Sequence, residues 1–260
     1  MRKAGRKRSG GRSARIAARQ SKVNEITTSI ERRIPYFDVL NEEALGLIEH
    51  NAETVLEEIG IEFREFKPAL KLLREAGADI DGERVRFPRG LCRNLLATAP
   101  SEYTQYARNP ERSTTIGGDR TVLVPAYGSP FIRNIDEGRR YATIEDFQNF
   151  VKLTYMSPGL HHSGGTVCEP VDIPVNKRHL DMVYSHIKYS DKPFMGSVTA
   201  PERAEDTIDM VKILFGEDFI QKKTVLTSLI NANSPLTFDA TMLGAATVYA
   251  ENNQATMISP

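Results

Sequence analysis

The spacing of hydrophobic positions changes at about Thr143, and this change divides the chain into two parts. After it, four short apolar stretches typical of buried strands alternate with stretches of helical period. Their starts lie roughly 30 residues apart, which is the length of one strand-plus-helix unit in a parallel sheet. The predicted strands cover about 160–167, 192–198, 224–230 and 254–259.

The predicted helices of this second part carry recognisable start and stop signals. Thr143 followed by Asp146 is typical of a capping box. Pro201 opens a later helix that Gly216 ends, and Thr237 is expected to cap the last one. These signals support a regular alternation of strand and helix.

Four such units correspond to the first half of a TIM-type (β/α)8 barrel, an α/β fold, and we assign residues 142–260 to it. Half a barrel leaves two open sheet edges, so we expect the sequence to be part of a longer protein. The alternative is an open four-stranded α/β sheet that is complete as it stands.

Residues 25–141 predict a small module of helices and a β-hairpin that precedes the barrel. Its clearest helix covers about 41–60, with Asn41 as N-cap, one apolar stripe and a stop at Gly60. The turn Asp81-Gly82 predicts the hairpin. No chemistry is evident in this module.

Charge distinguishes a third segment, residues 1–24, which we expect to be a disordered basic arm. It contains nine of the 34 basic residues and no acid, so residues 25–260 carry 25 basic and 34 acidic residues. A solvated tail explains the arm better than a nucleic-acid contact does, because basic tails alone specify no partner.

Composition excludes a membrane-spanning segment and a secretory signal. No apolar run approaches the roughly 20 residues that a membrane helix needs, and no apolar stretch follows the basic run. The two cysteines, Cys92 and Cys168, match no disulfide or metal pattern, so a reducing, cytoplasmic location is expected.

Candidate chemistry lies at or beyond the predicted strands, where parallel α/β folds build their ligand sites. No phosphate-binding or dinucleotide-binding motif occurs, no metal site is predicted, and Cys168 lacks an activating partner for a nucleophile. His179 and His186 are too far apart on one helix to share a metal, and we expect them to be outer-surface or packing residues. The candidate substrate-binding residues are His161, His162, Glu169, Ser197, Asn231 and Asn233.

Several segments resemble the trimethylamine methyltransferase family, from about residue 36 to the end of the chain. The most specific pieces are Gly-Ala-Asp-Ile-Asp at 77–81, Asp191-Lys192-Pro193 and Asn233-Ser234-Pro235-Leu236. The resemblance implies a (β/α)8 barrel of about twice this length. It also implies methyl transfer from trimethylamine or a betaine-like quaternary amine to the cobalt of a separate corrinoid protein. Some members use pyrrolysine, at a position that lies beyond Pro260.

On this interpretation the chain binds no cofactor itself, and its partners are the corrinoid protein and a small methylated amine. The resemblance assigns no catalytic residue here. Neutral polar groups, a carboxylate and aromatic faces suit a cationic substrate, and Tyr127 and Phe194 are the aromatic candidates. A non-enzymatic binding module for a cationic osmolyte is the alternative, and the sequence leaves homo-oligomerisation open.

Overall fold

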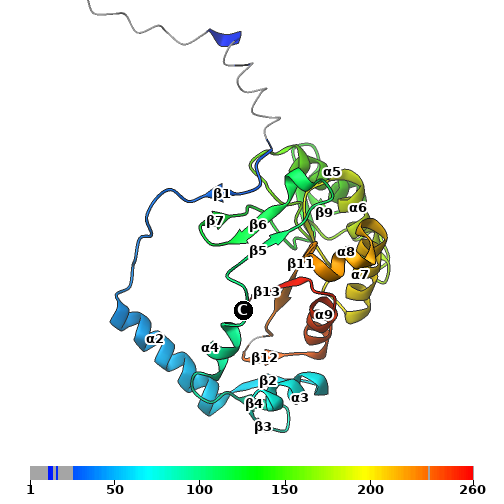
Figure 1. The fold of residues 1–260 in the computed structure, drawn as a ribbon. Helices are drawn as coiled ribbons and strands as arrows, with labels where there is room; N and C mark the ends of the chain where they lie inside the picture. The colour runs from blue at the N-terminus through cyan, green and yellow to red at the C-terminus, as the bar shows by residue number, and fades with distance from the viewer. Residues whose placement is uncertain (1–10, 14–15, 17–25, 234, 260) are drawn as a thin grey trace, which may run out of the picture.

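The computed structural model describes residues 11–13, 16, 26–233 and 235–259, so the predicted arm at 1–24 lies almost entirely outside the described residues. Figure 1 shows the second half of the chain gathered around a parallel sheet, with the first half packed beside and below it. In the part of the chain that is described, no helix is both long and apolar enough to cross a membrane.

The parallel sheet has the strand order β10-β11-β13, the order of these strands in the chain. Both pairs are parallel, with Phe194 opposite Leu226 and Leu229 opposite Met257. Three of the four strands predicted from the apolar stretches are therefore present and run in the predicted direction. Their bounds are β10 (Phe194–Met195), β11 (Leu226–Asn231) and β13 (Ala255–Ser259).

The remaining predicted strand, the first in the chain at about 160–167, is wrong as stated. This segment is only partly extended and forms no regular strand pairing. Ser163 N–H donates to the Pro193 carbonyl (2.7 Å) and Met195 N–H donates to the Gly164 carbonyl (2.9 Å), so the segment lies along β10. The two bonds are offset by one residue, and Gly164 has a φ of +86°. That left-handed conformation interrupts the strand at the point where the chain turns toward the cavity described below.

Helices cover one face of the parallel sheet, as Figure 1 shows for α7, α8 and α9. Leu226 and Ile230 of β11 pack there against Ile208 and Tyr249. Alternate residues of a strand point to opposite faces, so Thr227, Leu229 and Asn231 face away from these helices. The helices of this half are α5 (Ile144–Met156), α6 (Arg178–Tyr189), α7 (Pro201–Phe215), α8 (Glu217–Lys222) and α9 (Ala240–Glu251).

The predicted caps of these helices are confirmed with one exception. The Thr143–Asp146 capping box is formed at α5, Pro201 begins α7, and Gly216 ends it. The exception is Thr237, which lies in the short strand β12 (Thr237–Phe238). Asp239 caps α9 instead, through a 2.9 Å bond from Met242 N–H.

The first half of the chain contributes to one antiparallel sheet, one mixed sheet, in which β12 pairs with β2 in parallel, and a hairpin. One sheet has the order β1-β7-β6-β5, and the hairpin is β8-β9. The second sheet, β12-β2-β4-β3, includes the predicted hairpin and also β12 from the second half of the chain. The strands are β1 (Ile30–Glu31), β2 (Ile61–Phe63), β3 (Asp79–Asp81), β4 (Arg84–Arg86), β5 (Glu102–Gln105), β6 (Thr114–Gly117), β7 (Arg120–Thr121), β8 (Phe131–Asn134) and β9 (Gly138–Tyr141).

The helix predicted over 41–60 is present as α2 (Glu42–Thr54) followed by a π-helical segment, η1 (Val55–Ile59). Asn41 accepts from Ala44 N–H (2.9 Å), which confirms the predicted N-cap. The apolar stripe is not buried, however, because Leu45 and Ile48 are more than half exposed. The remaining helices are α3 (Lys67–Glu75), α4 (Leu91–Leu96) and the 3-10 turn η2 (Pro110–Arg112).

Candidate functional site

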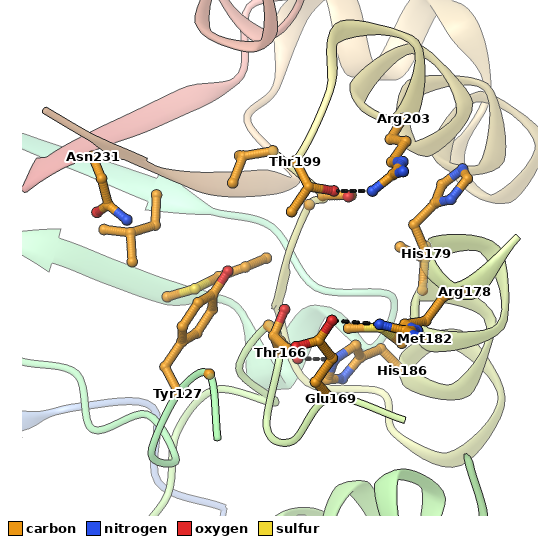
Figure 2. Close-up of a pocket in the computed structure, with 18 of the residues that line it drawn as sticks. Tyr127, Thr166, Glu169, Arg178, His179, Met182, His186, Thr199, Arg203 and Asn231 are labelled. Carbon is orange, nitrogen blue, oxygen red and sulfur yellow. Dashed lines mark hydrogen bonds and ion pairs between the residues drawn. The ribbon is translucent and has the colours of Figure 1, made fainter. Parts of the chain in front are cut away.

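A cavity of about 250 Å³ lies where the parallel segments end. Its walls include residues that follow the 163–164 segment, the loop after β10 and the end of β11, with α6 and α7 closing one side (Figure 2). Such a position, at the carboxyl ends of parallel strands, is where α/β folds place their ligands.

Much of the lining is apolar or aromatic. Met182, Met195, Leu229 and Met242 supply apolar surface, and the ring of Tyr127 projects into the cavity in Figure 2. Gly165 lets the ring lie this close, because a Cβ there would come within 2.8 Å of Tyr127 Cε2. The aromatic face is therefore held by a local contact that only a residue without a side chain permits.

Charged side chains gather on the α6 and α7 side of the cavity. Arg178 pairs with Glu169, and His179 Nε2 lies 2.7 Å from Asp206 Oδ2. Arg203 donates from Nη1 to Thr199 Oγ1 (2.7 Å) and has no carboxylate within ion-pair distance among the described residues. This wall therefore presents one guanidinium group whose charge is not neutralised by a described neighbour.

His186 lines the inner part of the cavity as a neutral imidazole. Its Nε2 donates to the Gly165 carbonyl (2.8 Å), and its Nδ1 accepts from Ser163 Oγ (2.7 Å). Burial lowers the pKa of His186 to about 4, so it carries no charge at neutral pH. With both nitrogens engaged, it fixes the backbone around Gly165 rather than offering a free base.

Three of the six residues predicted to bind substrate line this cavity: Glu169, Ser197 and Asn231. Their binding role stays a prediction. Glu169 is engaged by Arg178, so its carboxylate does not face the cavity as an unpaired charge. Asn231 lies opposite Ser259 in the register of β11 and β13, at the edge of the cavity.

The other three predicted residues, His161, His162 and Asn233, do not line this cavity. His161 Nδ1 accepts from Leu123 N–H (2.9 Å), and burial, followed by the charge of Lys192, lowers its pKa. Asn233 donates to Asp239 Oδ2 (2.8 Å) and so supports the N-cap of α9.

His162 is buried in a polar network on the side away from the helices. Its Nδ1 accepts from Gly164 N–H (2.9 Å), and its Nε2 lies 3.2 Å from Gln105 Oε1, so Nε2 carries the proton. Burial, and to a smaller extent the neighbouring His186, lower its pKa to about 3. The imidazole is a structural hydrogen-bonding group that links β5 to the parallel segments.

Sequence reasoning missed Arg178, His179, His186 and Arg203, which come from α6 and α7 rather than from strand tips. The expectation that His179 and His186 are packing residues agrees with their burial, but an outer-surface position is wrong for both. A usable signal was present: Arg178 and His179 open the helix that follows the first strand-end loop, a place where α/β folds present side chains to ligands.

The surroundings of Cys168 explain why it is a poor nucleophile. Cys168 is buried, and burial raises its pKa to about 12, which leaves too little thiolate for a nucleophile at neutral pH. Among the residues that the structure describes, no three histidine, cysteine or carboxylate side chains converge in a way that could hold a metal ion.

The Asp191-Lys192-Pro193 segment serves the fold. Lys192 is buried, and its Nζ donates to the carbonyls of Thr154 (2.7 Å), in the last turn of α5, and of Ser157 (3.0 Å) and Leu160 (2.7 Å), which follow that helix. Asp191 pairs with Arg112 (2.7 Å) of the first half of the chain. These contacts hold the start of β10 in place and leave the cavity to other residues.

Comparison with known proteins agrees with the resemblance noted in the sequence. The chain is 48% identical over 227 residues to the glycine betaine methyltransferase of Desulfitobacterium hafniense (strain Y51), covering 87% of this chain and 47% of that protein. It is 30% identical over 147 residues to the proline betaine:corrinoid methyltransferase of Eubacterium limosum, covering 55% of this chain and 30% of that protein. The chain thus spans less than half the length of these curated relatives.

The family-level match is broader than either pairwise similarity. A model of the trimethylamine methyltransferase family matches residues 8–260, which is nearly the whole chain. The expectation drawn from the quoted sequence segments is thereby confirmed at the level of the family. This chain belongs to the trimethylamine methyltransferase family.

Proposed function

We propose that this chain supplies part of the substrate site of a methyltransferase that moves a methyl group from a quaternary amine to the cobalt of a corrinoid protein. Support comes from the family membership and from the two relatives, which are named as a glycine betaine methyltransferase and a proline betaine:corrinoid methyltransferase. We also propose that β10, β11 and β13, with the segment before them, are the first strands of a (β/α)8 barrel.

The observation that carries the proposal is the exposed face of Tyr127 in a cavity that is otherwise largely apolar. A quaternary ammonium group has no N–H and cannot donate a hydrogen bond from nitrogen, so it is recognised by aromatic faces and by exclusion of water. The rings of aromatic residues attract such cations by about 0.5–2 kcal/mol, and more strongly when water is excluded. Met182, Met195 and Leu229 complete an apolar surround for the methyl groups.

The chemistry of the transfer fits a site without a protein nucleophile. The bond between nitrogen and methyl carbon breaks with its electron pair left on nitrogen, so the quaternary amine departs as a neutral tertiary amine. The acceptor supplies the electron pair that forms the new bond to the methyl carbon. His186 is neutral and fully bonded, and Cys168 is buried as a thiol, so neither competes for the methyl group.

Methyl transfer and the place of Tyr127 can be tested together in the protein as encoded in full. Mixing it with reduced cobalamin and glycine betaine should give the absorption spectrum of methylcobalamin. Tyr127→Leu should raise KM about tenfold, because one cation–π contact is lost. Tyr184→Leu is the matched control, since Tyr184 is half-exposed on α6 and does not line the cavity.

Two results would count against the proposal. Binding of glycine betaine without any methylcobalamin would favour the alternative, a non-enzymatic module for a cationic osmolyte. Equal KM values for Tyr127→Leu and Tyr184→Leu would leave methyl transfer intact but remove Tyr127 from the site.

A further inference from the structure

The geometry points to a carboxylate-binding subsite on the α6 and α7 side of the cavity, with Arg203 as its principal residue. The substrate would then be a zwitterion that carries a carboxylate near its quaternary nitrogen, rather than trimethylamine or choline. This inference rests on the proposed function and adds to it the class of substrate and the residue that selects it.

Arg203 is the first observation. It is the third residue of α7, and its guanidinium is held from one side by Thr199 Oγ1 at 2.7 Å. A guanidinium has five N–H donors, and a single bond to a hydroxyl leaves most of them available. The other cavity-lining guanidinium, Arg178, is already paired with Glu169. Arg203 is therefore the group on this wall that is best placed to bind an added anion.

The second observation is a pair of buried nitrogen atoms with no partner in the described part of the chain, Arg178 Nε and His179 Nδ1. Both residues line the cavity, and His179 is only 5% exposed. A buried polar atom without a partner is costly, which indicates that a bound group completes the site. Arg178 Nε can only donate, so an acceptor is required there.

His179 shares this wall with Arg178 and Arg203. Its Nε2 lies 2.7 Å from Asp206 Oδ2, so Nδ1 is the ring nitrogen that is left without a partner among the described residues. The N-terminus of α7, which has no side-chain cap, adds positive potential to the same wall.

The two ends of a zwitterion match the two sides of the cavity. Figure 2 shows Arg203, His179 and Arg178 on one side, and Tyr127 and Asn231 on the other. A quaternary nitrogen near Tyr127 would direct an attached carboxylate toward Arg203. A compound with a hydroxyl in place of the carboxylate would leave the donors of this wall without a charged acceptor.

The test is calorimetric binding of two probes, glycine betaine and choline, to the protein as encoded in full, without any methyl acceptor. Wild-type protein should bind glycine betaine more tightly than choline. Arg203→Gln should weaken glycine betaine binding about 10- to 100-fold, the effect of losing a charge-assisted hydrogen bond. Its effect on choline should stay within about threefold. Arg133→Gln, at an exposed position of β8, is the matched control.

Equal losses for both probes, or unchanged binding of glycine betaine, would overturn the subsite. Arg203→Lys keeps the charge and should show an intermediate loss, and it serves in place of Arg203→Gln if that variant does not fold. A wild-type protein that binds neither probe yet demethylates trimethylamine would also overturn the subsite while leaving methyl transfer standing. Failure of methyl transfer with intact selectivity for glycine betaine would reject only the proposed reaction.

Discussion

At the scale of single residues, the buried polar groups of this protein serve mainly to hold segments together. His162, Lys192 and Gln105 are all buried and each makes several hydrogen bonds. A histidine within a predicted strand has the same appearance in sequence whether it binds substrate or anchors a loop. The partner that decides the role of His162 is Gln105, 57 residues earlier in the chain.

The neutral state of His162 predicts a pH dependence of stability. Its pKa is about 3 in the folded protein, against about 6.5 when unfolded, so unfolding takes up a proton between these values. The stability it contributes is complete above about pH 6.5 and is lost as pH falls toward 3. His186, with a pKa of about 4, adds a second proton in the upper part of that range.

Urea unfolding between pH 5 and 6.5 measures this effect. Near pH 5 the two histidines together should lower the free energy of unfolding by about 2.7 kcal/mol for each pH unit by which the solution is made more acidic. His162→Gln should make the slope shallower by about 1.4 kcal/mol per pH unit, because one proton no longer takes part. His50→Gln, at an exposed position of α2, is the control. Identical slopes for wild type and His162→Gln would show that His162 is not neutralised by folding.

At the scale of elements, local signals predicted the helices well and the pairing of short strands poorly. The capping box of α5 and the boundaries of α7 are set by residues within one turn of each helix end. By contrast, β12 has two residues, and its pairing with β2 joins positions about 175 residues apart, which no local period can indicate. The apolar stripe over 41–60 correctly indicated a helix. Whether the stripe is buried depends on which elements pack against α2, and the helical period does not indicate that.

The link from β5 to the parallel sheet depends on Gln105. Its Nε2 donates to the carbonyls of Phe194 (2.9 Å) and Val225 (3.1 Å), and its Oε1 accepts from Thr227 Oγ1 (2.8 Å) and from His162. Gln105→Leu keeps a similar volume but leaves these buried groups without partners. We expect it to lower the free energy of unfolding by about 2–4 kcal/mol.

Chemical denaturation followed by circular dichroism measures that loss. Gln221→Leu is the control, because Gln221 is exposed on α8 and its side chain makes no hydrogen bond among the described residues. A loss below about 1 kcal/mol for Gln105→Leu would mean that water or rearranged neighbours replace the amide.

At the scale of the whole molecule, the cavity joins strand tips to residues of the outer helices. Strand-end reasoning found Glu169, Ser197 and Asn231, because parallel strands bring their ends to a common edge. It could not find the arginines on the α6 and α7 side of the cavity. Arg178 and Arg203 line the cavity from the first turns of these two helices, not from strand ends. The charge asymmetry of the site therefore becomes visible only in three dimensions.

The two halves of the chain are connected strongly enough that we expect them to unfold together. Glu62 N–H donates to the Leu236 carbonyl (2.9 Å) and Arg64 N–H to the Phe238 carbonyl (2.8 Å), which ties β2 to β12. Tyr106 N–H donates to the Thr224 carbonyl (2.8 Å), next to the Gln105 network. Two hydrogen-bonded seams, one at each end of the β11–β12 region, oppose independent opening of the first half.

Hydrogen exchange followed by mass spectrometry, at increasing urea concentrations below the main transition, tests this expectation on the protein as encoded in full. Peptides covering β2–β4 and peptides covering β11 should lose protection at the same urea concentration. Gln105→Leu weakens one seam, so the two sets of peptides should then separate or shift together to lower urea, while Gln221→Leu should leave both unchanged. If β2–β4 exchange well before β11 in the wild-type protein, the halves are independent units and the seams contribute little to cooperativity.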